Sequence, residues 1–210
     1  KGVAFTRDDL RELSYASLLH DFGKIGVREQ VLVKAKKLYP HELELIKARF
    51  QLASRSLEND FLTRKLRLVG RGAAPADLQA LDQDFEARRA ELGEALAVVI
   101  GANEPTVLQG GEYSRIEALG RETYVDAHGH THPLLTPPEI ASLSIARGSL
   151  TPGEFDEIRS HVTHTFEFLS KIPWGKQFRR VATIAGSHHE RLNGTGYPNR
   201  LHAAEIPLQS

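Results

Sequence analysis

The hydrophobic pattern predicts helices along most of the chain. Thr6 is expected to cap a first helix, in which apolar residues recur at helical spacing into His20. Two longer stripes of apolar residues lie on either side of a glycine-rich break at residues 69–75. They predict two long amphipathic helices that form an antiparallel hairpin. The three stripes are Leu10, Leu13, Ala16 (or Ser17) and Leu18; Leu43, Ile46, Phe50, Ala53, Leu57 and Phe61; and Leu78, Leu81, Phe85, Leu92, Ala95, Leu96 and Val99.

Beyond the long hairpin, the pattern predicts shorter elements. A short helix is expected near residues 115–119. Residues 123–125 and 133–135 can pair as a small β-hairpin across residues 126–132. Since this is the one departure from helical patterning, the fold class is expected to be mainly all-α.

The last part of the chain carries strong helix-start signals. Thr136 and Thr151 are each followed by proline and, three residues on, by glutamate, which is the pattern of a capping box. The helix that follows Thr151 is expected to end before Pro173. A last helix is expected over about residues 176–190.

Composition narrows the function classes. The 27 basic and 27 acidic side chains give zero net charge, which argues against nucleic-acid binding through phosphate neutralisation. The absence of cysteine excludes disulfides, thiolate metal sites and a cysteine nucleophile. No apolar run is long enough for a membrane span, and the first residues lack the layout of a signal peptide. Because no methionine opens the chain, we expect a fragment of a longer cytoplasmic polypeptide.

An adjacent histidine and aspartate at the end of the first helix give the first chemical signal. His20 and Asp21 offer two unlike metal ligands, and a carboxylate can bridge two cations. Gly23 allows close backbone approach, and Lys24 places a positive charge suited to a phosphate oxygen. Taken alone, the pair is also typical of an ordinary helix cap or surface pair.

A histidine pair followed by a glycine loop gives the second signal. His188 and His189 stand at the end of an apolar segment. The loop offers backbone N–H groups to an anion, an aromatic ring that can stack on a base, and a proline that stiffens the turn. Taken alone, the same residues fit a solvated helix end and a glycine turn. The loop residues are Gly194, Gly196, Tyr197 and Pro198.

Together the two motifs resemble the HD-GYP family, a subgroup of the HD phosphohydrolase superfamily. The similarity covers roughly residues 8–36 and 147–208, with His161 on a helix between the motifs. It implies an HD-domain helical bundle that is interrupted by an inserted helical hairpin. The implied parts are residues 1–38, the first part of the HD-GYP domain; 39–146, the inserted helical region; and 147–210, a C-terminally truncated second part.

The resemblance also implies a metal centre with a substrate loop. Asp21 would bridge the metals and Lys24 would contact the scissile phosphate, so both are expected to be catalytic. Glu190 is expected to hold the metal ligands in place without binding a metal itself. The implied metal ligands are His20, Asp21, His161, His188 and His189. The implied substrate-binding residues are Lys24, Gly194, Gly196, Tyr197 and Pro198.

Members of this family hydrolyse cyclic di-GMP in bacterial second-messenger signalling, often to GMP. They use two or three divalent metal ions, commonly iron or manganese, and nitrogen and oxygen donors also suit nickel, cobalt or zinc. Two metals can clamp a phosphodiester and lower the pKa of a bridging water. The resulting hydroxide would attack phosphorus in line, while Lys24 stabilises the developing charge.

The match departs from the family in two ways. Asn193 stands where the family usually has aspartate. The asparagine can keep a turn hydrogen bond, but it lacks the negative charge. Further family ligands are expected upstream of this chain and beyond Ser210. Two alternatives therefore stay open: a degenerate domain that binds nucleotides or proteins without turnover, and a hydrolase for another cyclic dinucleotide or nucleotide.

The remaining histidines allow more than one interpretation. His164 lies three residues after His161, so it is either a further ligand or a packed histidine. His128, His130 and His132 alternate, which fits either a metal loop or a solvated hairpin tip. The two histidines expected at the surface are His41 and His202.

The inserted hairpin must bury its apolar stripes. We expect it to act as a homodimerisation or regulatory arm, with a lid over the site or a functionless elaboration as alternatives. The expected partners are a cyclic dinucleotide substrate and a sensor or regulatory domain elsewhere in the full protein. Neither nucleic acid nor membrane is expected as a partner.

Overall fold

The computed structural model describes residues 4–106 and 110–210. They form two compact units, one of residues up to Val33 with Pro152–Ser210 (the outer unit) and one of Lys34–Thr151 (the hairpin unit). Helices dominate both units, so the mainly α fold class is confirmed. The assignment of the units to an HD domain and an insertion stays a prediction. Within the described residues, no helix is long and apolar enough to cross a membrane.

Helix α1 (Arg7–Leu19) opens the outer unit at its expected cap. The Thr6 hydroxyl accepts a hydrogen bond from the Asp9 N–H at 3.1 Å, and the Asp9 carboxylate accepts one from the Thr6 N–H at 2.9 Å. This capping box satisfies N–H groups that have no partner inside the helix. Two members of the predicted apolar stripe, Leu10 and Leu18, are exposed, so the stripe is wrong at these positions.

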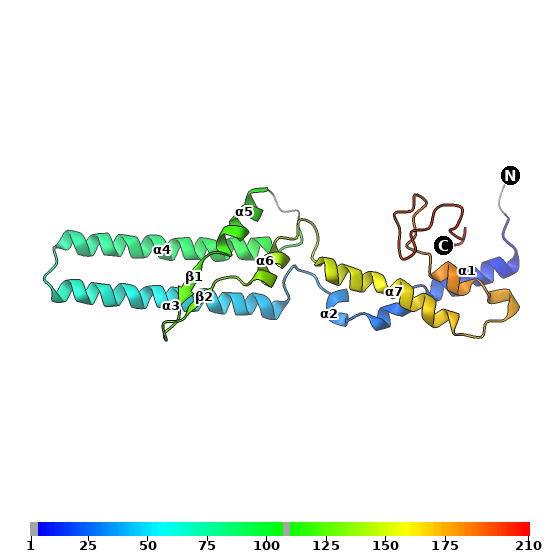
Figure 1. Cartoon of the computed structure of the whole chain (residues 1–210), viewed down its shortest axis with the longest axis horizontal. Helices are drawn as coiled ribbons and strands as arrows, with labels where there is room; N and C mark the ends of the chain where they lie inside the picture. The colour runs from blue at the N-terminus through cyan, green and yellow to red at the C-terminus, as the bar shows by residue number, and fades with distance from the viewer. Residues whose placement is uncertain (1–3, 107–109) are drawn as a thin grey trace. The chain divides into compact units, whose positions relative to one another are not determined.

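Two helices from the second half of the chain complete the outer unit. Helix α7 (Pro152–Ser170) and helix α8 (Val181–Ala185) contact each other, and α8 also contacts α1 (Figure 1). Between the first and second motifs, the chain forms a 3-10 turn at Phe22–Gly26 and the short helix α2 (Glu29–Leu32). The core of this unit consists of Ala16, Leu169, Val181, Ala182, Ile184 and Ala185.

The predicted continuous helix over residues 176–190 is wrong. A single 3-10 turn at Lys176–Phe178 precedes the five residues of α8. The Arg180 N–H donates to the buried Glu12 carboxylate at 2.8 Å, instead of to a carbonyl of the preceding turn. This bond interrupts the helix, since helical N–H groups must bond within the helix. Helix α8 ends at Ala185, and residues 188–189 lie in the turn that follows it.

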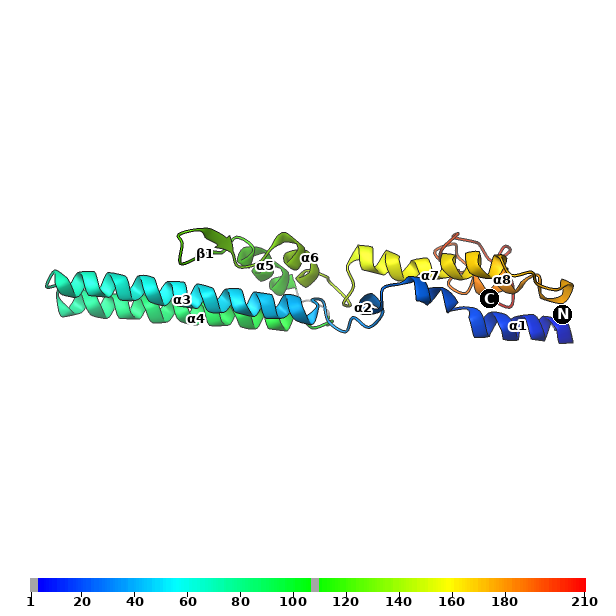
Figure 2. The ribbon, with the colours of Figure 1, turned by 90° about the horizontal axis from the view of Figure 1, so that it is seen from below.

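Two long helices form the hairpin unit. Helices α3 (Pro40–Gly70) and α4 (Pro75–Ala102) lie antiparallel along their length, as Figures 1 and 2 show. In the half of the pair nearer the connecting loop, the rings of Phe61 and Phe85 stack with centroids 4.3 Å apart. The predicted helical hairpin is therefore confirmed. The buried core of this unit consists of Leu38, Ile46, Phe50, Ala53, Val99, Ala102, Ile116, Leu134, Leu135 and Leu143.

Smaller elements pack beside this pair (Figure 2). They are helix α5 (Gly110–Leu119), strands β1 (Thr123–Val125) and β2 (Thr131–Pro133), and helix α6 (Pro137–Leu143). The short helix and the β-hairpin are thus present as predicted. The capping box at the start of α6 is also confirmed, because Thr136 and Glu139 exchange both hydrogen bonds.

The second strand of the small sheet lies two residues earlier than expected. Thr123 pairs with Pro133 and Val125 with Thr131, so the predicted strand at residues 133–135 is wrong. Leu134 and Leu135 are instead buried in the core of the hairpin unit. Burial of these two leucines among the helices ends the strand at proline.

Replacing Phe50 with alanine tests the packing of the hairpin unit. Because Phe50 is only 3% exposed, Phe50→Ala should lower the free energy of unfolding by about 3–5 kcal/mol. Leu52→Ala is the matched control on the same helix, since Leu52 is 57% exposed and its loss should cost about 0.5 kcal/mol or less. Urea denaturation followed by circular dichroism measures both. Equal losses for the two variants would contradict the assigned core.

Candidate metal centre

The Asp21 carboxylate lies among charged and imidazole groups from three segments of the outer unit. Oδ2 lies 2.7 Å from Lys24 Nζ and 3.2 Å from His20 Nε2. Oδ1 lies 3.2 Å from Nε2 of His161 on α7, and 3.9 Å from Nε2 of His188 in the turn after α8. Both carboxylate oxygens therefore face imidazole nitrogens.

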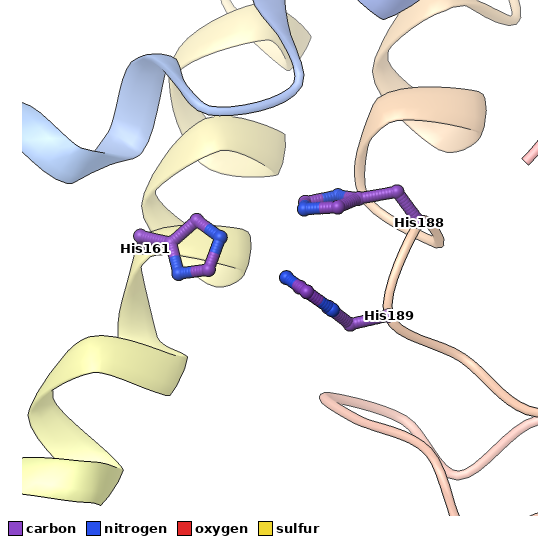
Figure 3. Close-up of side chains that lie close together, drawn as sticks. All are labelled: His161, His188 and His189. Carbon is purple, nitrogen blue, oxygen red and sulfur yellow. The ribbon is translucent and has the colours of Figure 1, made fainter.

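Three histidines converge beside this carboxylate. Figure 3 shows His161 on its helix facing His188 and His189 on the turn. One ring nitrogen from each lies within 4.8 Å of the others, and the ligand atoms of His20, Asp21 and His188 form a second such group. Because the two groups share His188, the site offers overlapping sets of metal donors.

The backbone fixes which nitrogen of each ring faces the cluster. In three of the histidines, Nδ1 lies at hydrogen-bond distance from the carbonyl oxygen three residues earlier. A carbonyl can only accept, so Nδ1 carries the hydrogen, and in the neutral ring Nε2 presents its lone pair. The bonded pairs are His20 with Ser17 at 2.7 Å, His161 with Ile158, and His188 with Ala185 at 2.6 Å.

Two of these ring nitrogens have a lone pair that nothing satisfies. Nε2 of His161 and Nε2 of His188 are buried and have no hydrogen-bond partner. A lone pair that faces a carboxylate oxygen at 3.2 Å is repulsive unless a proton or a cation lies between them. Imidazole nitrogen and carboxylate oxygen together are ligands for divalent transition metals. The donors that fit such ions are His20, Asp21, His161, His188 and His189.

Protonation states in the cluster favour metal binding. Partial burial raises the pKa of Asp21, but the Lys24 hydrogen bond, with the electrostatic influence of the neighbouring His20, Lys24 and His161, outweighs it and lowers the pKa below its ordinary value. Burial, together with the neighbouring His188 and His161, lowers the pKa of His189 to about 4. Burial also lowers the pKa of His188. At neutral pH the carboxylate is ionised and both rings are neutral, which are the forms that bind metal.

The glycine loop packs against the histidine pair. Gly196 is buried, and a Cβ there would lie 2.4 Å from the Glu190 Cα. The Tyr197 N–H donates to the His189 carbonyl at 3.2 Å, and the two rings stack with centroids 4.7 Å apart. Pro198 follows through a cis peptide bond. Only a residue without a side chain fits at Gly196, so glycine lets the tyrosine reach the histidine.

Polar side chains hold the two ends of this loop. The Glu190 carboxylate accepts hydrogen bonds from the N–H groups of Asn199 at 2.7 Å and Leu201 at 2.9 Å. Glu190 therefore fastens the segment after the loop, and its oxygens bond to backbone. The Asn193 side-chain oxygen accepts from the Thr195 N–H and hydroxyl at 3.1 and 2.7 Å. The turn hydrogen bond expected of Asn193 is thus present.

The remaining histidines of the outer unit lie outside the donor groups. The His164 ring lies against Gly26, where a Cβ would be 2.7 Å from its Nδ1, so His164 has a packing role. The His202 ring covers Gly194, where a Cβ would lie 2.6 Å from it. Gly194 also has φ of +74°, a left-handed conformation that favours glycine. In the hairpin unit, His41 is exposed as expected.

Thr165 joins the His-Asp turn to helix α7, a role that the sequence did not suggest. Its hydroxyl accepts a hydrogen bond from the Gly23 N–H at 2.8 Å and donates one to the His20 carbonyl at 3.0 Å. A Cβ at Gly23 would lie 2.0 Å from the His161 carbonyl oxygen, so the turn rests directly on the helix. In the sequence, Thr165 looks like one member of an apolar stripe. Its only signal is that it lies one helical turn after His161.

Arg159 is a second residue that sequence reasoning missed. Its guanidinium carbon lies 4.6 Å from the centroid of the Tyr197 ring. The ring therefore has the His189 imidazole and the Arg159 guanidinium in contact with it. This adds a positive charge beside the glycine loop.

The comparison with protein families agrees with this geometry. The family profile described as an HD domain matches residues 125–210. The matched segment includes His161, the histidine pair at residues 188–189 and the glycine loop. The superfamily expected from the two motifs is therefore confirmed.

The chain is also similar to parts of three curated proteins. It is 35% identical over 78 residues to a 3'3'-cGAMP-specific phosphodiesterase 3 of Vibrio cholerae, covering 34% of this chain and 16% of the relative. It is 43% identical over 61 residues to a cyclic di-GMP phosphodiesterase of Thermotoga maritima, covering 29% and 16%. It is 38% identical over 72 residues to the cyclic di-GMP phosphodiesterase response regulator RpfG of Xanthomonas campestris pv. campestris, covering 33% and 18%.

The chain thus spans less than a fifth of the length of these relatives. No solved structure matches it significantly.

Substitution of Thr165 tests how the outer unit holds its His-Asp turn. Thr165→Val keeps the shape of the side chain but removes the hydroxyl, which leaves the Gly23 N–H and the His20 carbonyl without their partner. The free energy of unfolding should fall by about 1–3 kcal/mol. Thr163→Val is the control, because Thr163 is exposed on the same helix. Equal stability of the two variants in urea denaturation would refute this role.

Proposed function

We propose that the HD domain is a metal-dependent phosphodiesterase that hydrolyses a cyclic dinucleotide, with cyclic di-GMP as the substrate. One observation carries this proposal. The Asp21 carboxylate faces the buried, unpaired Nε2 atoms of two histidines, and a lysine ammonium contacts its other oxygen. This arrangement supplies metal ligands and a positive charge for a phosphate at one place.

The names of the relatives support the substrate class. Among five similar curated proteins, two are named for cyclic di-GMP and three for 3'3'-cGAMP, and both compounds are cyclic dinucleotides with two phosphodiester bonds. The resemblance of the motifs to the HD-GYP family favours cyclic di-GMP. Hydrolysis of 3'3'-cGAMP is the alternative that the name of the Vibrio cholerae relative supports.

Different residues of the chain would have different roles in hydrolysis. His20, Asp21 and the histidines of α7 and the turn would hold divalent metals, which supply Lewis acidity and a nucleophile at neutral pH when bound. Lys24 lies 2.7 Å from Asp21, so its ammonium can approach a phosphate that these ligands orient and can stabilise the charge that develops on it. The Tyr197 ring offers a flat surface for a base, and Arg159 adds a donor for phosphate beside it.

The finer predictions concern the ions and the rest of the polypeptide. We propose iron or manganese as the bound metals, since a nitrogen and oxygen donor set without thiolate suits both, as it suits nickel, cobalt and zinc. A sensor domain elsewhere in the protein and a cytoplasmic location stay predictions. Homodimerisation through the inserted hairpin also stays a prediction, motivated by exposed apolar residues along α3, namely Leu45, Leu52, Leu62, Leu66 and Val69.

Replacing Asp21 tests the proposed activity. Asp21→Asn keeps the size of the side chain but removes the charge that the metals need. In the full-length protein reconstituted with manganese or iron, bound metal and turnover of cyclic di-GMP should both fall, turnover by about a thousandfold or more. Asp8→Asn is the control, because Asp8 is an exposed acid of α1.

Metal content and product formation are measured on the same samples. Full turnover by Asp21→Asn would refute the assigned role of Asp21. A wild-type protein that is loaded with metal but inert toward cyclic di-GMP would overturn the proposed activity. Turnover of 3'3'-cGAMP alone would move the assignment to that substrate.

Arg159 is predicted to act in substrate binding rather than in the chemical step. Its guanidinium contacts the Tyr197 ring, whereas the Asp21 carboxylate bonds to other groups. Arg159→Ala should therefore raise KM for the cyclic dinucleotide about tenfold with a smaller change in kcat. Arg159→Lys should restore only part of the loss, since ammonium lacks the planar face. A fall in kcat at unchanged KM would contradict this assignment.

A further inference from the structure

A second cluster of metal-binding side chains lies at the tip of the β-hairpin in the hairpin unit. Between β1 and β2, the Asp126 Oδ2 lies 2.9 Å from His132 Nε2 and 3.4 Å from His130 Nδ1. One ligand atom from each of these three residues lies within 4.8 Å of the others. The site described above uses none of them.

The backbone of the turn orients the carboxylate. Oδ1 of Asp126 accepts hydrogen bonds from the N–H groups of His128 at 2.8 Å and His130 at 2.9 Å. Gly129 has φ of +85°, which lets the chain reverse tightly enough for both bonds to form. Because Oδ1 is held by the backbone, Oδ2 projects toward the imidazoles. Such outer hydrogen bonds are typical of carboxylates that bind a metal through one oxygen.

The strands fix the hairpin on its own unit. The Ser56 hydroxyl on α3 donates to the Val125 carbonyl at 2.5 Å, immediately before Asp126. The Tyr124 ring lies beside the His132 ring, with centroids 5.5 Å apart. The donors therefore start from anchored backbone, which lowers the entropy cost of gathering them around an ion.

Charge and access also suit a cation. Hydrogen bonding by His132, reinforced by the N–H groups of His130 and His128, holds the pKa of Asp126 far below its usual range, so the carboxylate stays ionised. The His130 side chain is 73% exposed, so an ion can reach the cluster from solvent. His128 is also exposed, and its ring centroid lies 6.3 Å from that of His130.

We propose that Asp126, His130 and His132 form a separate site for one divalent transition-metal ion, such as zinc or nickel. Two imidazole nitrogens and one carboxylate oxygen are donors for these metals, whereas magnesium and calcium take mainly oxygen ligands. The remaining coordination positions are open to water. The site is independent of the proposed phosphodiesterase activity, since it shares no residue with the Asp21 cluster.

The competing explanation is a turn that is held only by hydrogen bonds. Asp126→Asn distinguishes the two, because the asparagine oxygen can still accept both backbone N–H bonds while its amide nitrogen cannot bind a metal. His132→Gln is a second variant that removes a ligand by another route. His128→Ala is the matched control on the same turn, since His128 lies outside the three-donor group.

The experiment is a zinc titration of the metal-stripped full chain by calorimetry, repeated for each variant. The wild-type chain and His128→Ala should bind about one more zinc ion per chain than Asp126→Asn and His132→Gln. All four proteins keep the Asp21 cluster unchanged, so the difference reports on the hairpin site alone. Cobalt substituted for zinc should give a visible absorption band that both variants lose, and excess magnesium should not displace it. Equal zinc stoichiometry for the wild type and Asp126→Asn would overturn the proposal and leave a hydrogen-bonded turn only.

Discussion

A carboxylate that faces buried imidazole lone pairs is the interaction on which the rest of the outer unit depends. The Asp21 oxygens lie 3.2 Å from ring nitrogens of His20 and His161, and the backbone already occupies the other nitrogen of each of these rings. Two acceptor atoms that face each other at this distance repel unless a proton or a cation lies between them. Lys24 supplies one positive charge at one oxygen. One ammonium group does not compensate all of these acceptor atoms, which is the physical reason to expect metal ions. The nitrogen and oxygen donors of the cluster suit such ions.

Close contacts with neighbouring segments fix the turn that carries His20 and Asp21. Gly23 rests on the backbone of α7, and the Thr165 hydroxyl bonds to the turn on both sides of Asp21. On the opposite side, the end of α8 presents a histidine pair, and the Gly196 backbone lies against the residue that follows this pair. Each ligand therefore belongs to a segment whose position a neighbouring segment determines. Such support is what a metal centre needs to keep its donors within bonding geometry.

The sequence predicts the ends of helices that are fixed by hydrogen bonds between nearby residues. It does not predict helix ends that depend on hydrogen bonds to residues far away in the chain. Thr6 bonds to Asp9 three positions away, so the start of α1 follows from a local pattern. The break in the helix before α8 depends on Glu12, which accepts from the Arg180 N–H 168 positions away. The same holds for the site. Paired motifs identify its ligands by residue type, but the hydroxyl of Thr165 carries no sign that it holds a turn 142 residues away.

Anomalous diffraction tests directly whether metal ions bind beside Asp21. Crystals of the full-length protein grown with manganese and measured at the manganese absorption edge would locate the bound ions without reference to activity. We expect an anomalous peak within bonding distance of the Asp21 carboxylate and of Nε2 of His161 or His188. Occupied manganese sites elsewhere, with no peak beside Asp21, would contradict it.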